Sequence, residues 1–201
     1  DIVNILEDTS HESANILMTA NGLVDLLIPR GGAGLIRACV ERATVPCIQT
    51  GTGICHVYVE NTAQPEMADR IIVNAKCQRP SVCNAMETLL VEKEIARSYI
   101  PHIAAIMREH AVTMYGDPES CALSDLILPA KEDSFDTEYN DLIMNVGIVD
   151  DTLAAINHIE KHGTHHSDAI ITESDAEKEL FFAGVDSACV YHNASTRFTD
   201  G

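Results

Sequence analysis

Apolar and polar residues follow two different periods along the chain, and the two periods alternate. Short apolar runs closed by Pro, Gly or Asp are typical of buried strands. Between them, apolar residues recur three and four positions apart, as Met67, Ala68, Ile71 and Ile72 do after Pro65, which predicts amphipathic helices. The predicted strands are 24–29, 46–50, 56–60, 87–91, 124–130, 142–150, 168–172 and 187–191.

The helical pattern fills the gaps between most of these runs. Ser174 and Glu177 form a capping box that predicts the start of the last helix. Because Pro101 has no amide hydrogen, we expect it to limit the first turn of the helix over 94–111. Strands that alternate with helices predict an α/β fold, with a largely parallel, buried sheet flanked by helices. The other predicted helices are 35–43, 65–75 and 151–162.

The composition is that of a folded, acidic protein. With 46% hydrophobic residues among 201, the chain can bury a core. The formal net charge of −18 disfavours binding to nucleic acid and to anionic membranes, because both require basic side chains, whereas it leaves a phosphorylated small molecule possible. We recognise neither a signal peptide nor an apolar run of about 18 residues. The sequence begins without Met and ends abruptly, so we expect a piece of a longer protein.

The cysteines are spread evenly and include no C-x-x-C pair, which disfavours a zinc ribbon and a thioredoxin motif and favours reduced thiols in the cytoplasm. Cys83 is the candidate nucleophile, because it lies in the polar, proline-containing stretch QRPSVCNA and a reactive thiol must be accessible. Cys77 is a weaker candidate. Cys39, on a helical stripe, and Cys189, in a strand, are more simply core residues.

Two further patterns carry less information. The histidines of GTHHSD (163–168) and the pair Cys55–His56 suggest metal ligands, but adjacent side chains on a strand point to opposite faces. We therefore expect no metal site, with His165 and His166 divided between the surface and a pocket. The turn RGGAG (30–34) precedes a helix and suits a phosphate, although it lacks the G-x-G-x-x-G and P-loop spacings.

Five motifs, in this order, closely resemble the γ-glutamyl phosphate reductases (glutamate-5-semialdehyde dehydrogenases) of the aldehyde dehydrogenase superfamily. They are IPRGGAGLI, NAKCQRPSVCNAMETLLV, TEYNDLI, GTHHSDAIIT and VDSACVYHNASTRFTDG, and the similarity covers essentially all of the chain. The resemblance implies an aldehyde dehydrogenase-like fold. It also implies that 1–50 is the C-terminal part of an NADPH-binding domain and that 51–201 is a catalytic domain, incomplete at its C-terminal end.

The activity implied by the resemblance is the NADPH-dependent reduction of L-glutamyl 5-phosphate to glutamate 5-semialdehyde and phosphate, in proline biosynthesis, through a thioester on Cys83. Gly31 and Gly32 resemble the turn beside the cofactor, and Glu138 resembles the glutamate that holds the nicotinamide ribose. Asn193 matches the asparagine close to the substrate. The resemblance also allows a homo-oligomer and coupling to glutamate 5-kinase in the parent protein.

Three more residues are candidates for substrate binding. Arg79 and Arg197 suit the phosphate or the α-carboxylate, because a bidentate guanidinium binds either anion, and His166 joins them.

Cys77 stands where the family usually has threonine, and under oxidation it could form a reversible disulfide if the geometry permits. His192 replaces a usual apolar residue.

Gln49 bears on the alternatives, since many members of the family carry glutamate there. In hydrolytic aldehyde dehydrogenases that position holds the base that activates water, and glutamine cannot be a general base. A reductase is therefore favoured over a hydrolytic dehydrogenase, and a non-catalytic fragment that acts only in assembly is the third hypothesis. We expect the isolated chain to be inactive, because hydride transfer needs a positioned cofactor.

Overall fold

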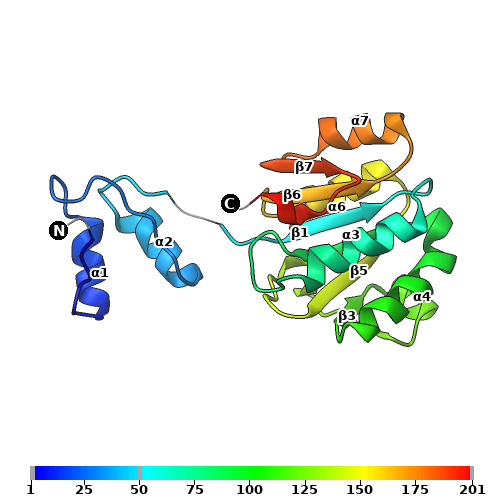
Figure 1. Cartoon of the computed structure of the whole chain (residues 1–201), viewed down its shortest axis with the longest axis horizontal. Helices are drawn as coiled ribbons and strands as arrows, with labels where there is room; N and C mark the ends of the chain where they lie inside the picture. Colours follow the sequence, from blue (N-terminus) through cyan, green and yellow to red (C-terminus); the bar gives the residue numbers. More distant parts are fainter. Residues whose placement is uncertain (1–2, 49–50, 200–201) are drawn as a thin grey trace. The chain divides into compact units, whose positions relative to one another are not determined.

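The computed structural model describes residues 3–48 and 51–199, except for the side chain of Ala33. The chain divides into two compact units, Asp1–Gly51 and Thr52–Gly201 (Figure 1). That these units belong to a cofactor-binding and a catalytic domain stays a prediction.

The first unit contains two helices, α1 (His11–Met18) and α2 (Ala33–Arg42). The prediction of α2 is confirmed, whereas α1 was not predicted. The strands expected over 24–29 and 46–50 are wrong for the described residues, because Leu27 and Cys47 form only an isolated parallel bridge. An apolar run becomes a parallel strand only where neighbouring strands satisfy its backbone.

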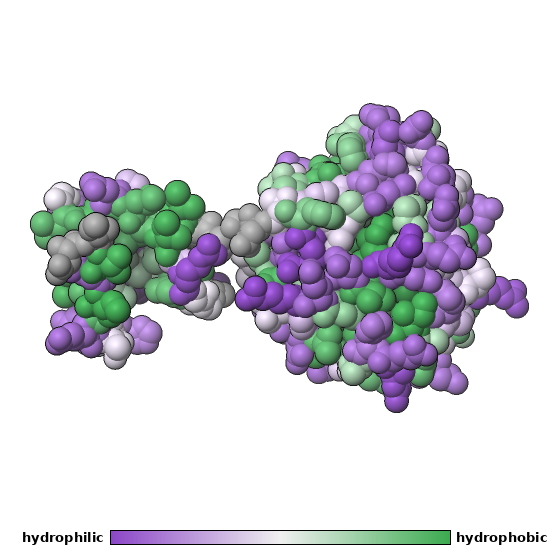
Figure 2. Space-filling view, in the orientation of Figure 1, coloured by the Kyte–Doolittle hydropathy of each residue, from purple (hydrophilic) through white to green (hydrophobic). Residues whose placement is uncertain are grey.

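Several apolar side chains of the first unit are exposed, and its surface in Figure 2 is largely apolar. Ile5 and Leu23 are both 89% exposed. Exposed apolar patches are the kind of surface that another segment or partner covers in many proteins. Among the described residues, no helix is long and apolar enough to cross a membrane.

The second unit is built on a seven-stranded sheet in which every pair of neighbouring strands is parallel, in the order β4-β3-β5-β2-β1-β6-β7. This confirms the predicted α/β fold with a parallel sheet. The strands are β1 (Cys55–Val59), β2 (Met86–Glu92), β3 (Thr113–Gly116), β4 (Ile127–Pro129), β5 (Ile143–Val149), β6 (Ser167–Ile171) and β7 (Cys189–His192).

Helices cover both faces of this sheet (Figure 1). On one face Ile72 and Ile100 pack against Val57 and Leu89 of the central strands. On the other face Ile156 and Phe181 pack against Tyr58 and Leu90. Burial on both sides explains why the strands read as continuous apolar runs. The first face carries α3 (Pro65–Cys77), α4 (Lys93–Glu109) and α5 (Pro118–Leu123), and the second carries α6 (Thr152–His162) and α7 (Asp175–Gly184).

The position of Pro101 differs from the prediction. It lies well inside α4, which begins at Lys93, so it does not limit the first turn. A proline inside a helix costs about 3 kcal/mol, because it removes one backbone hydrogen bond and crowds the preceding turn. The buried face of α4, with Ile100, Ile103 and Met107, offsets this cost, since each large apolar side chain that is fully buried contributes about 1.5–3 kcal/mol.

Candidate active site

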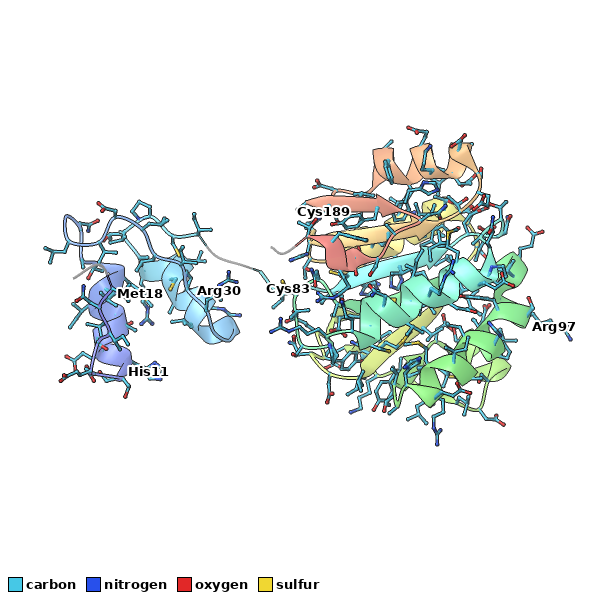
Figure 3. The ribbon with its side chains drawn as sticks, in the orientation of Figure 1. His11, Met18, Arg30, Cys83, Arg97 and Cys189 are labelled. Carbon is cyan, nitrogen blue, oxygen red and sulfur yellow. The ribbon has the colours of Figure 1, made fainter. Side chains whose placement is uncertain are left out.

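The segments that precede the parallel strands gather at one edge of the sheet, the amino edge. Cys83 lies just before β2 and Gly53 just before β1. Thr164 and His166 precede β6, and Glu138 precedes β5. Figure 3 shows Cys83 at the end of the second unit where the central strands begin. The topology therefore brings most of the predicted site residues of this unit to one place.

The peptide of Cys83 is held by two contacts from the start of β1. A Cβ atom added at Gly53 would lie 1.5 Å from the carbonyl oxygen of Cys83, so only glycine allows the two backbones to approach this closely. The thiol of Cys55 donates a hydrogen bond to the same oxygen at 3.2 Å. The side chain of Cys83 is half-buried, so a rigid backbone presents a partly accessible sulfur.

Glu138 reaches the same contact from the loop before β5. Its Oε1 accepts a hydrogen bond from the backbone N–H of Gly53 at 2.7 Å. The next amide, that of Ile54, donates to Oγ1 of Thr164 at 2.9 Å. Cys83, Gly53 and Glu138 thus form one cluster, although they come from three separate segments of the chain.

Other thiols are poorly suited to act as nucleophiles. Burial raises the pKa of Cys55 well above its ordinary value, with a smaller contribution from the carboxylate of Asp168. Burial also raises the pKa of Cys39 and that of Cys77. Since the thiolate is the reactive form, these environments disfavour reaction at all three cysteines.

Arg197 is brought toward Cys83 by the last helical turn, η2 (Thr196–Phe198). Oγ1 of Thr196 donates to the carbonyl oxygen of Asn84 at 2.7 Å, and Nδ2 of Asn84 donates to the carbonyl oxygen of Thr199 at 2.5 Å. Nε of Arg197 is buried and has no hydrogen-bond partner within residues 3–48 and 51–199. The unpartnered Nε of Arg197 therefore belongs to the residue next to Thr196, which bonds Asn84, the neighbour of Cys83.

The remaining predicted substrate residues lie in different surroundings. Arg79 is exposed in the loop between α3 and β2, on the amino-edge side. His166 is half-buried at the same edge, and its Nδ1 hydrogen-bonds Oγ of Ser167 at 2.9 Å. His165 is exposed, and its Nδ1 bonds the carbonyl oxygen of Asp186.

Asn193 is not brought together with Cys83. It follows β7 and therefore lies at the carboxyl edge, opposite the amino edge. Its side-chain amide bonds both the N–H and the carbonyl oxygen of Thr172, at 3.0 Å each, and its φ of 51° reverses the chain. Nε2 of the neighbouring His192 bonds the same carbonyl at 3.0 Å. In this structure the Asn193 amide links two strand ends.

Gly31 and Gly32 lie in the first unit, where Gly32 is the N-cap of α2. No side chain caps this end of the helix, and a Cβ at Gly32 would meet no atom within 4 Å. Amides at such a terminus suit an anionic or carbonyl group of a ligand. Gln49 lies outside the described residues.

The residues that suggested a metal site do not converge. Within the part of the chain that the structure describes, no three His, Cys, Asp or Glu side chains form a metal-binding group. Nδ1 of His56 instead contacts Oδ1 of Asp168 at 3.1 Å, and both side chains are buried.

An open hollow of about 590 Å³ lies elsewhere, along α3 and α4 beside Cys77. Its lining includes no residue of the Cys83 cluster, so its size does not indicate the reactive site.

His158 on α6 lies in an aromatic group. Its ring centroid is 4.6 Å from that of His162, 5.1 Å from Phe135 and 5.5 Å from His56. Its Nε2 is buried without a hydrogen-bond partner among the described residues. Burial, together with the imidazoles of His56 and His162, lowers the pKa of His158 from 6.5 to about 3.

Acid is therefore expected to destabilise the protein through His158. Below pH 6.5 the unfolded chain binds a proton there that the folded state excludes until about pH 3, so the free energy of unfolding falls as the pH decreases through this window. At pH 5 the loss is about 2 kcal/mol. Urea unfolding at pH 7 and pH 5 measures it. Between pH 7 and pH 5 the parent should lose about 2 kcal/mol more than His158→Phe does, because the contributions of the other titrating groups cancel in this comparison, while His110→Gln at an exposed position should behave like the parent. Equal pH dependence in the parent and in His158→Phe contradicts the assignment.

Known proteins resemble the chain over its whole length. It is 53% identical over 201 residues to the γ-glutamyl phosphate reductase of Shouchella clausii and 51% identical over 201 residues to that of Limosilactobacillus reuteri. The crystal structure of the γ-glutamyl phosphate reductase of Thermotoga maritima matches with a TM-score of 0.93 and 41% identity, over 98% of this chain and 47% of that one. The chain is a close relative of these reductases.

The relation to γ-glutamyl phosphate reductases covers only part of their length. The chain spans about half of each curated relative, 48% and 49% for the two named above. No family model matches the chain. An acetylating aldehyde dehydrogenase from Geobacillus thermoglucosidasius shares the fold, with a TM-score of 0.72 and 20% identity over 94% of this chain and 50% of that one. The predicted aldehyde dehydrogenase-like fold is therefore confirmed.

Proposed function

We propose that this chain carries the nucleophile of a γ-glutamyl phosphate reductase, with Cys83 as the attacking residue. The full-length protein reduces L-glutamyl 5-phosphate to glutamate 5-semialdehyde and phosphate, with NADPH, as a step of proline biosynthesis. The observation that carries the proposal is the cluster at the amino edge, where the backbone of Cys83 packs on Gly53 and Gly53 is bonded by Glu138. The identity of about 50% to reductases over the whole chain supports the substrate.

The chemistry uses Cys83 twice. Its thiolate attacks the acyl carbon of the substrate, a carbon–sulfur bond forms, the carbon–oxygen bond to phosphate breaks, and phosphate leaves. The nicotinamide cofactor, when bound, supplies a hydride to the carbonyl carbon of the thioester. The resulting oxyanion needs hydrogen-bond donors, for which the backbone N–H of Cys83 is our candidate. Collapse of the oxyanion then breaks the carbon–sulfur bond and releases aldehyde and thiolate.

Two arginines are our candidates for the anionic groups of the substrate. The unpartnered Nε of Arg197 supports a role for this residue, because a buried guanidinium nitrogen gains most from an anionic partner. Arg79 is exposed and lies closer along the chain to Cys83. His166, at the same edge, is a third candidate. The expected contact of Asn193 with substrate stays a prediction from the resemblance alone.

Three residues are our candidates for binding a nicotinamide cofactor. Glu138 places a carboxylate beside Gly53, which packs on the backbone of Cys83. A carboxylate suits a ribose hydroxyl. Gly31 and Gly32, at the uncapped start of α2, are our candidates for the turn beside the cofactor. A solved structure of an engineered glycolyl-CoA reductase with bound NADP⁺ has the same fold, with a TM-score of 0.70 and 18% identity.

The test uses the reaction in reverse. Full-length protein is incubated with glutamate 5-semialdehyde and NADP⁺, with and without inorganic phosphate, and reduced cofactor is measured. A reductase forms reduced cofactor only when phosphate is present, because phosphate must attack the thioester. Formation of glutamate without phosphate favours the hydrolytic dehydrogenase instead, and inactivity under both conditions contradicts the proposed function. A cytoplasmic location, a homo-oligomer and coupling to glutamate 5-kinase stay proposals.

A further inference from the structure

A buried ion pair lies next to the Cys83 cluster. Nζ of Lys76, on α3, is 2.9 Å from Oε2 of Glu87, on β2, and both side chains are fully buried. Burial raises the pKa of Glu87 to about 7 and lowers that of Lys76. Removing two charges from water is costly, and hydrophobic replacements of such pairs are often as stable. Stability alone therefore does not explain why Lys76 and Glu87 are buried as an ion pair.

Glu87 occupies an irregular position in the sheet. The pairing of β1 with β2 shifts by one residue, so that Cys55 lies opposite Met86 while His56 lies opposite Thr88. Glu87 is the extra residue of this bulge. Bulges are frequent beside active sites, where they redirect a side chain. Here the bulge comes four residues after Cys83, near the start of the strand that follows it.

The second oxygen of Glu87 holds the loop that carries Glu138. Its Oε1 accepts the backbone N–H of Asn140 at 3.4 Å. Asn140 has a φ of 55°, a left-handed conformation that must be held by its surroundings. One carboxylate thus joins α3, β2 and this loop.

The same loop reaches the nucleophile from its other end. Glu138 bonds the N–H of Gly53, and Gly53 packs on the carbonyl of Cys83. A continuous set of contacts therefore runs from Lys76 through Glu87, the loop and Gly53 to Cys83. Loss of the acceptor at Glu87 would remove one anchor of the loop without touching the thiol, and would leave the hydrogen bond from the Tyr139 hydroxyl to Asn145 in place.

We propose that Glu87, paired with Lys76, is a positioning residue that fixes Glu138 against Gly53 beside Cys83. This inference rests on the proposed function, because it assigns Glu87 a role in the same site. Lys76 neutralises the carboxylate so that both of its oxygens can be buried, one toward α3 and one toward the loop.

Two double variants of the full-length protein separate positioning from stability. Lys76→Met with Glu87→Gln removes both charges but keeps an oxygen that accepts from Asn140. Lys76→Met with Glu87→Leu removes the charges and that acceptor. We expect the Gln variant to keep phosphate-dependent activity within about threefold of the parent and the Leu variant to lose about tenfold or more in kcat, since small misplacements beside a reacting group are costly. The urea midpoint of the Leu variant should be at least as high as that of the parent.

Hydrogen exchange gives a readout that does not depend on turnover. The amides of Gly53, Tyr139 and Asn140 should exchange faster in the Leu variant than in the Gln variant, while the central amides of β5 stay protected. Equal activity and equal exchange in the two variants would overturn the proposal. If the Leu variant fails to fold, Glu87→Asp replaces it, because a side chain shorter by one methylene cannot reach both Lys76 and the loop; unaltered exchange at Tyr139 and Asn140 in that variant also overturns the proposal.

The two proposals fail in distinguishable ways. If the parent protein shows no phosphate-dependent activity, the proposed function fails, but exchange at Tyr139 and Asn140 still decides whether Glu87 holds the loop. If the parent is active and both double variants match it in kcat and exchange, the positioning role fails while the proposed function stands.

Discussion

Serine in place of Cys83 is expected to lower phosphate-dependent cofactor reduction by at least about 10³-fold in the full-length protein. An alcohol is protonated at neutral pH and is a far weaker nucleophile than a thiolate, while the exchange of sulfur for oxygen changes little in a half-buried side chain. The urea midpoint should therefore stay close to that of the parent. Steady-state rates and mass spectrometry of the acylated protein measure the loss of reactivity, and urea unfolding measures the stability.

Cys189→Ser is the matched control, since Cys189 is also half-buried but lies on β7, whereas Cys83 lies in the loop before β2 (Figure 3). It should keep nearly full activity. Iodoacetamide should also label Cys83 faster than Cys39 or Cys189. Retained turnover in Cys83→Ser, or labelling of Cys83 no faster than of the other two, removes Cys83 from its role.

Gly53→Ala should damage both stability and catalysis. The added methyl group would lie 1.5 Å from the carbonyl oxygen of Cys83, and backbone on both sides must move to admit it. We expect a loss of at least about 3 kcal/mol in the free energy of unfolding. We also expect a fall of about 100-fold in kcat, because the peptide of the nucleophile is displaced. Urea unfolding and steady-state kinetics give the two numbers.

Gly34→Ala is the corresponding control, because a Cβ at Gly34 in α2 would meet no atom within 4 Å. Alanine in a helix is more favourable than glycine by up to about 1 kcal/mol, so this variant should be as stable as the parent or more so. If Gly53→Ala is as stable as Gly34→Ala and keeps the turnover of the parent, the close approach of Gly53 to Cys83 is not a constraint on the protein.

Local patterns sufficed for most of the sheet but failed where elements are short. The apolar runs of β1, β2, β5 and β6 are buried on both faces and could be recognised individually. The strand β3 (Thr113–Gly116) has only four residues and no clear period, so it was missed. The short helix α5 was also missed, although Asp117 caps it by accepting from the N–H of Ser120 and Pro118 opens it, both of which are visible in the sequence.

The site could be predicted only in part, because contacts between distant segments have no local signature. The polar context of Cys83 singled out this residue, and the motif resemblance singled out Glu138. That Gly53 joins the two depends on the register of β1 against β2, which no residue pattern specifies. The edge of the sheet at which Asn193 lies follows from the direction of β7, and the predicted strand over 187–191 in a parallel sheet already implied the carboxyl edge.

The pairing of β1 with β6 has a consequence for how the protein folds. His56 lies beside Asp168, so the centre of the sheet joins segments at opposite ends of the second unit's sequence. Such high contact order slows folding, since a long loop must close before the pairing contributes. During synthesis the ribosome must release β6 before β1 gains its second neighbour, and until then the Thr164 hydroxyl cannot accept the hydrogen bond from Ile54, next to Gly53.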